Sequence, residues 1–191
     1  MRASRRSFAG RTLAAATFLA AYCTGAQGAE PTVQIERDMT RDAMHVRAFI
    51  DIEAAPAIVW GVIVDCSRAP QIVPNMESCR VVDRDPAGRW EIRETLLNVM
   101  LLPRIHSVMR NDFEPRRRMA FKRIDGDMRI SEGEWRLEPL ANGKATRLRY
   151  DAVFSPAFEV PQFLIEQAAA RDFPTLFRAI ERESLADAGK N

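Results

Sequence analysis

The feature that most constrains the fold is a long amphipathic segment near the end of the chain, residues 161–188. On a period of 3.6 residues, one face of this segment is apolar and the opposite face is polar. The apolar face comprises Ile165, Ala169, Phe173, Leu176, Phe177 and Ile180. A lone amphipathic helix is unstable in water, so the rest of the chain must cover this face. The pattern favours a helix packed tightly on a sheet, and the alternative is a helix that roofs a cavity.

The chain before this helix is dominated by strand patterns separated by short turns. Apolar and polar residues alternate in many short runs, as in a half-buried strand. We predict strands at 33–39, 43–53, 79–83, 90–97, 104–114, 119–125, 128–138 and 146–154, and short helices at 57–64 and about 69–73. Turn sequences such as Asn142-Gly143-Lys144 separate the later strands. Strands joined by short turns predict an antiparallel sheet.

Residues 1–29 resemble a cleaved export signal. Arginines precede an apolar stretch at 12–22, and Ala26-Gln27-Gly28 offers small residues at the −3 and −1 positions. We therefore predict that residues 1–29 form an export signal that is cleaved near Gly28 or Ala29, and that residues 30–191 form a single domain in the periplasm. Ser4-Arg5-Arg6-Ser7-Phe8 resembles the twin-arginine export motif, and the general secretory route is the alternative.

The charge of the mature chain argues against a nucleic-acid partner. The full chain has 28 Lys and Arg against 26 Asp and Glu. Removing the four arginines of residues 1–29 leaves 24 against 26, so the net charge becomes −2. The basic excess belongs to the export signal, and no electrostatic footprint for nucleic acid remains.

Two cysteines remain after removal of the signal, Cys66 and Cys79. Because the periplasm is oxidising, we predict a disulfide between them. A loop of this length contributes about 3 kcal/mol to stability when it is closed. The alternative is two free thiols that act as small buried apolar groups.

Three stretches of sequence resemble the START-like superfamily, also called SRPBCC or Bet v 1-like. The first runs from Ile50-Asp51-Ile52-Glu53-Ala54-Ala55-Pro56 through Val59-Trp60 and Asp65 to Ile72-Val73-Pro74. The others are Gly133-Glu134-Trp135-Arg136-Leu137 and Thr146-Arg147-Leu148-Arg149-Tyr150. The resemblance covers residues 46–184 and is strongest to the polyketide cyclase/dehydrase and coenzyme Q-binding branch.

This resemblance implies an α+β helix-grip fold. A curved antiparallel sheet would wrap around the long C-terminal helix, with two short helices after the first main strand. Members of the superfamily hold lipids, sterols, isoprenoid quinones or polyketides in a cavity between sheet and helix, and a minority catalyse reactions. The resemblance thus favours the cavity over the solid core.

We expect the cavity to lie between the apolar stripe of the helix and one face of the sheet. The expected lining residues are Trp90, Ile92, Phe121, Trp135, Leu148 and Tyr150 from the sheet and Ile165, Ala169, Phe173 and Phe177 from the helix. His106 and Arg129 are the candidate polar groups. Each has an alternative, since a sheet histidine is often partly exposed and an arginine at the end of a strand can reach water.

The sequence contains no HExxH, CxxC, GxSxG or phosphate-binding glycine loop, so we expect no metal and no cofactor. The favoured function is binding or transport of a lipid, isoprenoid or quinone-like molecule. A cyclase or dehydratase that uses the same cavity is the main alternative, and an interaction module without a ligand is another. The apolar run at 96–103 is either a buried strand or a loop at the cavity mouth, where it would make peripheral membrane contact.

Overall fold

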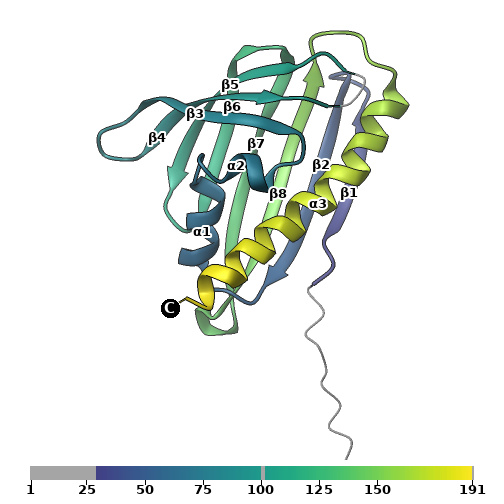
Figure 1. Cartoon of the computed structure of the whole chain (residues 1–191). Coiled ribbons are helices and arrows are strands. Elements are labelled where there is room, and N and C mark those ends of the chain that lie inside the picture. Colours follow the sequence, from purple (N-terminus) through teal and green to yellow (C-terminus); the bar gives the residue numbers. More distant parts are fainter. Residues whose placement is uncertain (1–28, 100–101, 191) are drawn as a thin grey trace, which may run out of the picture.

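A computed structural model describes residues 29–99 and 102–190 and contains one eight-stranded antiparallel sheet (Figure 1). The strand order is β1-β2-β8-β7-β6-β5-β4-β3. The strands are β1 Thr32–Asp38, β2 Ala43–Ile52, β3 Met76–Arg84, β4 Trp90–Leu97, β5 Ile105–Glu114, β6 Arg118–Gly126, β7 Met128–Leu140 and β8 Ala145–Pro156. β1 and β2 form a hairpin, and β8 returns from the β3–β8 meander to pair with β2. The predicted antiparallel sheet is confirmed.

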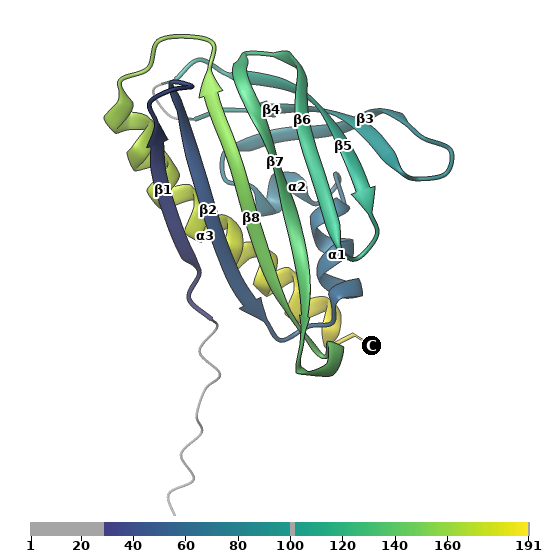
Figure 2. The same ribbon diagram turned by 180° about the vertical axis from the view of Figure 1, so that it is seen from behind.

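The described residues form three α-helices, which lie on one side of this sheet, and we call this side its inner face. They are α1 Pro56–Val64, α2 Ala69–Ile72 and α3 Gln162–Ala188, and a single 3-10 turn, η1 Ala141–Gly143, joins β7 to β8. α3 runs diagonally across the inner face, packed against β1, β2 and α1 (Figure 1). The view from behind shows the outer face with no helix over it (Figure 2). This arrangement is the predicted helix-grip fold.

The core lies where α1 and α3 meet the central strands. Its most deeply buried large side chains come from β2, β8, α1 and α3: Ile50, Ile52, Leu148, Val59, Val62, Phe177 and Ile180. Alternation in the strands and the 3.6-residue period in α3 bring these side chains to the same layer. α3 continues through Pro174, which has no backbone N–H to donate within the helix.

A disulfide ties the helical connector to the sheet, as predicted. Cys66 follows α1 and Cys79 lies in β3, and their Cα atoms are 5.5 Å apart. The bond therefore holds the edge strand β3 to the end of α1.

Two predicted features stay predictions. The predicted export signal spans residues 1–29, and all of it except Ala29 lies outside the described residues. The apolar run at 96–103 begins as the end of β4, and residues 100 and 101 lie outside the described part. Within the described residues, no helix is both long enough and apolar enough to span a membrane.

Candidate functional site

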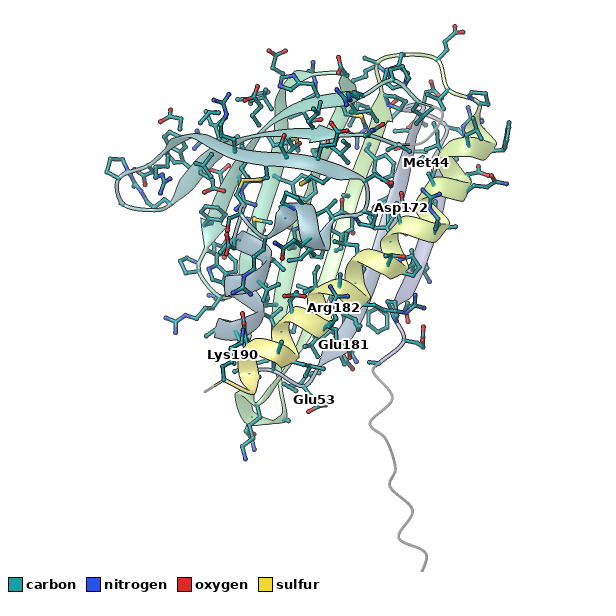
Figure 3. The ribbon with its side chains drawn as sticks, in the orientation of Figure 1. Met44, Glu53, Asp172, Glu181, Arg182 and Lys190 are labelled. Atoms are coloured by element: carbon teal, nitrogen blue, oxygen red, sulfur yellow. A yellow bond between two sulfur atoms is a disulfide. The ribbon has the colours of Figure 1, made fainter. Side chains whose placement is uncertain are left out.

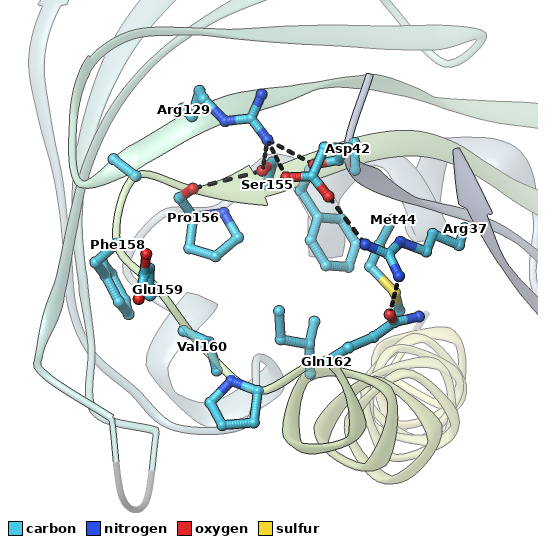
Figure 4. Close-up of a pocket in the computed structure, with 15 residues that line it drawn as sticks. Arg37, Asp42, Met44, Arg129, Ser155, Pro156, Phe158, Glu159, Val160 and Gln162 are labelled. Carbon is cyan, nitrogen blue, oxygen red and sulfur yellow. Dashed lines mark hydrogen bonds and ion pairs between the residues drawn. The ribbon is translucent and has the colours of Figure 1, made fainter. Parts of the chain in front are cut away.

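A groove of about 700 Å³ opens at the N-terminal end of α3. It lies between the β1–β2 turn, the end of β8, the connector at 157–161 and the first turn of α3 (Figure 4). Its apolar lining includes Met44, Phe154, Val160 and Ile165. The predicted lining residue Ile165 thus stands at this groove.

Polar side chains form one rim of the groove. Arg129 donates hydrogen bonds to the Asp42 carbonyl at 2.6 Å and to the Ser155 hydroxyl at 2.6 Å. Arg37 donates to Gln162 and pairs with Asp42 at 3.2 Å (Figure 4). Arg129, a candidate polar group from the sequence, lines the groove in the structure and has polar partners there.

Phe154 of the groove wall belongs to a cluster of aromatic rings from α3 and the sheet. Phe154 stacks on Phe173 with ring centroids 6.1 Å apart, and Phe173 packs on Tyr150 at 5.4 Å. Trp135 lies 4.5 Å from Tyr150 and 5.6 Å from Phe177. The rings of this aromatic cluster are Phe121, Trp135, Tyr150, Phe154, Phe173 and Phe177. Five of the six were predicted to line a cavity, and the structure brings them together.

The Tyr150 hydroxyl is held in its neutral form inside this cluster. Burial among the rings raises the pKa of Tyr150 above its ordinary value, because the phenolate loses hydration there, and Asp151 adds to the shift. A neutral phenol in an apolar site can donate a hydrogen bond to an oxygen of a bound molecule. Ala169 and Leu148 are buried around the cluster, at 5% and 0% exposure.

Three predicted residues lie on the wrong face of the sheet for an internal site. Directly paired residues of an antiparallel sheet lie on the same face. The strand pairing therefore identifies, strand by strand, the residues that share the inner face with Trp135. Phe121 pairs with Gly133, Asn111 with Phe121, and Glu91 with Asn111. Glu91 therefore faces inward and its neighbours in β4 face outward.

The prediction that Trp90, Ile92 and His106 line the cavity is accordingly wrong. The register places all three side chains on the outer face, where Trp90 and His106 have partners. The Arg110 guanidinium covers the Trp90 ring at 4.6 Å, and His106 Nε2 lies 2.8 Å from Glu94. Arg80 and His106 together hold the pKa of Glu94 below its ordinary value, the arginine contributing more. A guanidinium over the ring stabilises a tryptophan on the outer face, so Trp90 does not have to be buried in the core.

The inner face of β4 instead carries a buried ion pair. Arg93 donates to Glu91 and to the carbonyl oxygen of Val64, the last residue of α1. The Arg93 side chain is 10% exposed and that of Glu91 is 14% exposed. Arg93 thereby satisfies a helix-terminal carbonyl that the helix itself leaves unpaired.

Two buried donors beside this pair have no hydrogen-bond partner among the described residues. They are Asn111 Nδ2 and Arg123 Nε. Asn111 is 4% exposed, and its neighbour on the inner face, Met109, pairs with Arg123 across β5 and β6. An unpaired buried donor costs about 1–3 kcal/mol, so such groups are usually satisfied by an ordered water, an ion or a bound molecule. Both groups need an oxygen acceptor.

Sequence reasoning missed Glu91, Arg93, Asn111 and Arg123 because it assigned β4 by its aromatic residue. A weak indication was present in β5. Ile105, Met109 and Phe113 alternate with polar residues, and that alternation places Asn111 on the same face as Phe113. Extending this face to β4 through the turn would have required the register, which the sequence does not give.

The sequence profile of the family described as "Polyketide cyclase / dehydrase and lipid transport" matches residues 52–181. The chain belongs to this family. The earlier resemblance to START-like proteins and their cyclase/dehydrase branch is confirmed. Membership indicates binding of a lipid or other hydrophobic molecule, or polyketide cyclisation. No curated protein matches the chain in sequence.

Several solved structures share the fold at low sequence identity. A STAR-related lipid transfer protein from Xanthomonas axonopodis is 16% identical with a TM-score of 0.65, covering 81% of this chain and 93% of its own. The Zhui aromatase/cyclase from Streptomyces sp. R1128 is 17% identical with a TM-score of 0.62, covering 73% and 92%. Human STARD10 is 11% identical with a TM-score of 0.66, covering 84% and 71%. At these identities the likeness establishes the fold alone.

Proposed function

We propose that this protein, after export to the periplasm, binds and carries a hydrophobic small molecule of the lipid, isoprenoid or quinone-like class. The observation that carries the proposal is the groove of about 700 Å³ whose wall residue Phe154 stacks on Phe173 of the aromatic cluster. A pocket of this size and lining suits an apolar ligand. The family and the export signal support the same conclusion.

The polar groups of the inner face suit one end of such a ligand. Asn111 Nδ2 and Arg123 Nε are donors without partners among the described residues, and the Tyr150 hydroxyl stays protonated. These groups would receive a carbonyl, ester or carboxylate oxygen. We therefore propose a ligand with an apolar body and an oxygen-bearing end, rather than a pure hydrocarbon.

The experiment is a binding titration with a fluorescent long-chain fatty acid, using the chain without its export signal. Ile165→Trp adds bulk to the groove and is expected to weaken binding at least tenfold. The matched control is Gln167→Trp, because Gln167 lies two residues away on the exposed side of α3. Equal binding by the wild type and both variants would contradict the proposal that the groove admits the ligand.

A cyclase is the second candidate, and the same unpaired donors favour it. Asn111 and Arg123 could stabilise the negative oxygen of an enolate, which forms when a polyketide cyclises. The two functions differ in the fate of the bound molecule. A carrier releases its ligand chemically unchanged, whereas a cyclase converts an added linear poly-β-ketone to a ring, and mass spectrometry of the extract distinguishes them.

A further inference from the structure

Glu181 of α3 is a buried carboxylate without a paired cation. It is 8% exposed, and no arginine or lysine of residues 29–99 and 102–190 forms an ion pair with it. Its hydrogen bond comes from the backbone nitrogen of Ala29, which lies 3.0 Å from Glu181 Oε1. Figure 3 shows Glu181 on the part of α3 beside the start of the described chain. A buried carboxylate is expected to have a cation close by, because it has lost its hydration.

Both arginines that flank Glu181 in the sequence of α3, Arg178 and Arg182, are already engaged. Arg182 pairs with Glu183 at 3.1 Å. Arg178 pairs with Glu30 at 2.8 Å, which holds the residue after Ala29 against the helix. Ala29 itself is partly buried and packs against the core. Ala29 and Glu30 thus both contact the folded domain and hold the Ala29 nitrogen beside Glu181.

Ala29 also follows the small residues expected before a signal-peptidase cut. Ala26 and Gly28 occupy the −3 and −1 positions if the cut falls between Gly28 and Ala29. Hydrolysis there consumes one water, leaving a carboxylate on Gly28 and an amine on Ala29. An α-amino group is protonated at neutral pH, so the nitrogen beside Glu181 would become a cation.

We propose that the export peptidase cuts the Gly28–Ala29 bond and that the new α-ammonium of Ala29 is the counter-ion of Glu181. Cleavage of the signal thus creates the cation that pairs with this buried carboxylate. Of the two cleavage positions expected from the sequence, near Gly28 or Ala29, this contact selects the bond after Gly28. A cut after Ala29 would remove the nitrogen that contacts Glu181. This inference rests on the proposed export, but not on the proposed ligand.

Two measurements test it. The first is the N-terminal sequence of the protein isolated from the cells that make it, which is expected to begin at Ala29. A chain that begins at Glu30 would overturn the inference and leave export intact, whereas a chain that keeps residues 1–28 would overturn both.

The second measurement compares the thermal unfolding of chains that begin at Ala29 and at Gly28. Both can hydrogen-bond Glu181 through the Ala29 nitrogen, and the first alone carries the charge there. The Ala29 chain is expected to unfold about 5 °C higher, as for a partly buried ion pair in a domain of this size. Equal midpoints would overturn the inference.

Variants of α3 test whether Glu181 is the partner of the Ala29 α-ammonium. In Glu181→Gln the difference between the two chains is expected to vanish, and in the control Glu183→Gln it is expected to persist. A difference that survives in Glu181→Gln would assign the charge to another group and overturn the inference. If Glu181→Gln does not fold, enzymatic Nα-acetylation of the Ala29 chain removes the charge and is expected to lower its midpoint to that of the Gly28 chain. An unchanged midpoint would again overturn the inference.

Discussion

The inner face of the sheet has two halves that differ in polarity: an apolar half over β7, β8 and α3, and a polar half over β4, β5 and β6. Over β7, β8 and α3 the interior is apolar, and Trp135 and Phe177 are 9% and 0% exposed. Over β4, β5 and β6 it holds the Arg93–Glu91 ion pair and the unpaired donors of Asn111 and Arg123. The apolar half stabilises the fold by excluding water. The polar half contains donors that have no partner among the described residues and can bind another molecule. The comparison predicts that substitutions in the apolar half and in the buried ion pair lower stability, whereas a substitution at Asn111 lowers binding.

The largest expected effect is a loss of stability in the apolar half. Phe177→Ala removes a fully buried ring that contacts Trp135 at 5.6 Å, and it should lower the free energy of unfolding by about 4 kcal/mol. The control is Phe163→Ala, because Phe163 is 59% exposed on the same helix, and it should change stability little. Urea denaturation measures both. Similar losses for the two variants would contradict the assignment of α3's buried face.

Breaking the buried ion pair should have the next largest effect. Arg93→Met leaves the Glu91 carboxylate without its cation and the Val64 carbonyl without its donor, at a cost of about 3 kcal/mol. The double variant Arg93→Met/Glu91→Gln should recover much of this loss, since it removes the uncompensated charge. Arg80→Met on the outer face is the control, because the Arg80 side chain is 73% exposed. A loss as large in Arg80→Met would show that the inner face is misassigned.

Asn111→Leu should separate binding from stability. It removes a buried donor that has no partner among the described residues, so the free energy of unfolding should change by less than about 1 kcal/mol. Affinity for the fluorescent fatty acid should fall about tenfold if the side chain meets the oxygen-bearing end. A stable variant with unchanged affinity would leave the polar half without a role in binding.

The smallest expected effect concerns the outer face. Arg147 donates two hydrogen bonds to Asp51 at 2.7 Å, and it lowers the pKa of that carboxyl, the opposing effect of burial being weaker. A lowered folded-state pKa means that the stabilisation is present at neutral pH and is lost as the pH falls through that pKa. The Asp51 side chain is 38% exposed, so screening limits the contribution to at most about 1 kcal/mol.

Asp51→Asn should therefore lower stability slightly at pH 7 and leave it nearly unchanged at pH 2. Urea midpoints at the two pH values provide the measurement. An equal effect at both would mean that the ion pair is not the source of the stabilisation.

The apolar half was accessible from sequence because its pattern is strongly periodic. The stripe from Ile165 to Ile180 and the alternation around Trp135 both require burial, and the disulfide followed from the two remaining cysteines. These predictions depend on local periodicity or on elimination, and neither argument requires the register of the strands.

The polar half was not accessible, because its outcome depends on partners distant in sequence. Arg93 is buried because the Val64 carbonyl lies above it, 29 residues away along the chain. Trp90 faces outward because Arg110 covers it. A one-residue change in register exchanges the two faces of a strand, and the alternation of Trp90 and Ile92 with charged residues in β4 wrongly indicated that these two face inward. The groove at the start of α3 likewise depends on how the connector at 157–161 meets the β1–β2 turn.

The most direct test of ligand binding is native mass spectrometry of the protein isolated from its own cells, followed by organic extraction. The account predicts a complex heavier than the polypeptide by one small molecule, and recovery of an apolar compound with an oxygen-bearing end. It also predicts that Ile165→Trp carries less of this compound than Gln167→Trp. A protein that is isolated without any ligand and takes up none from a lipid extract would contradict the account.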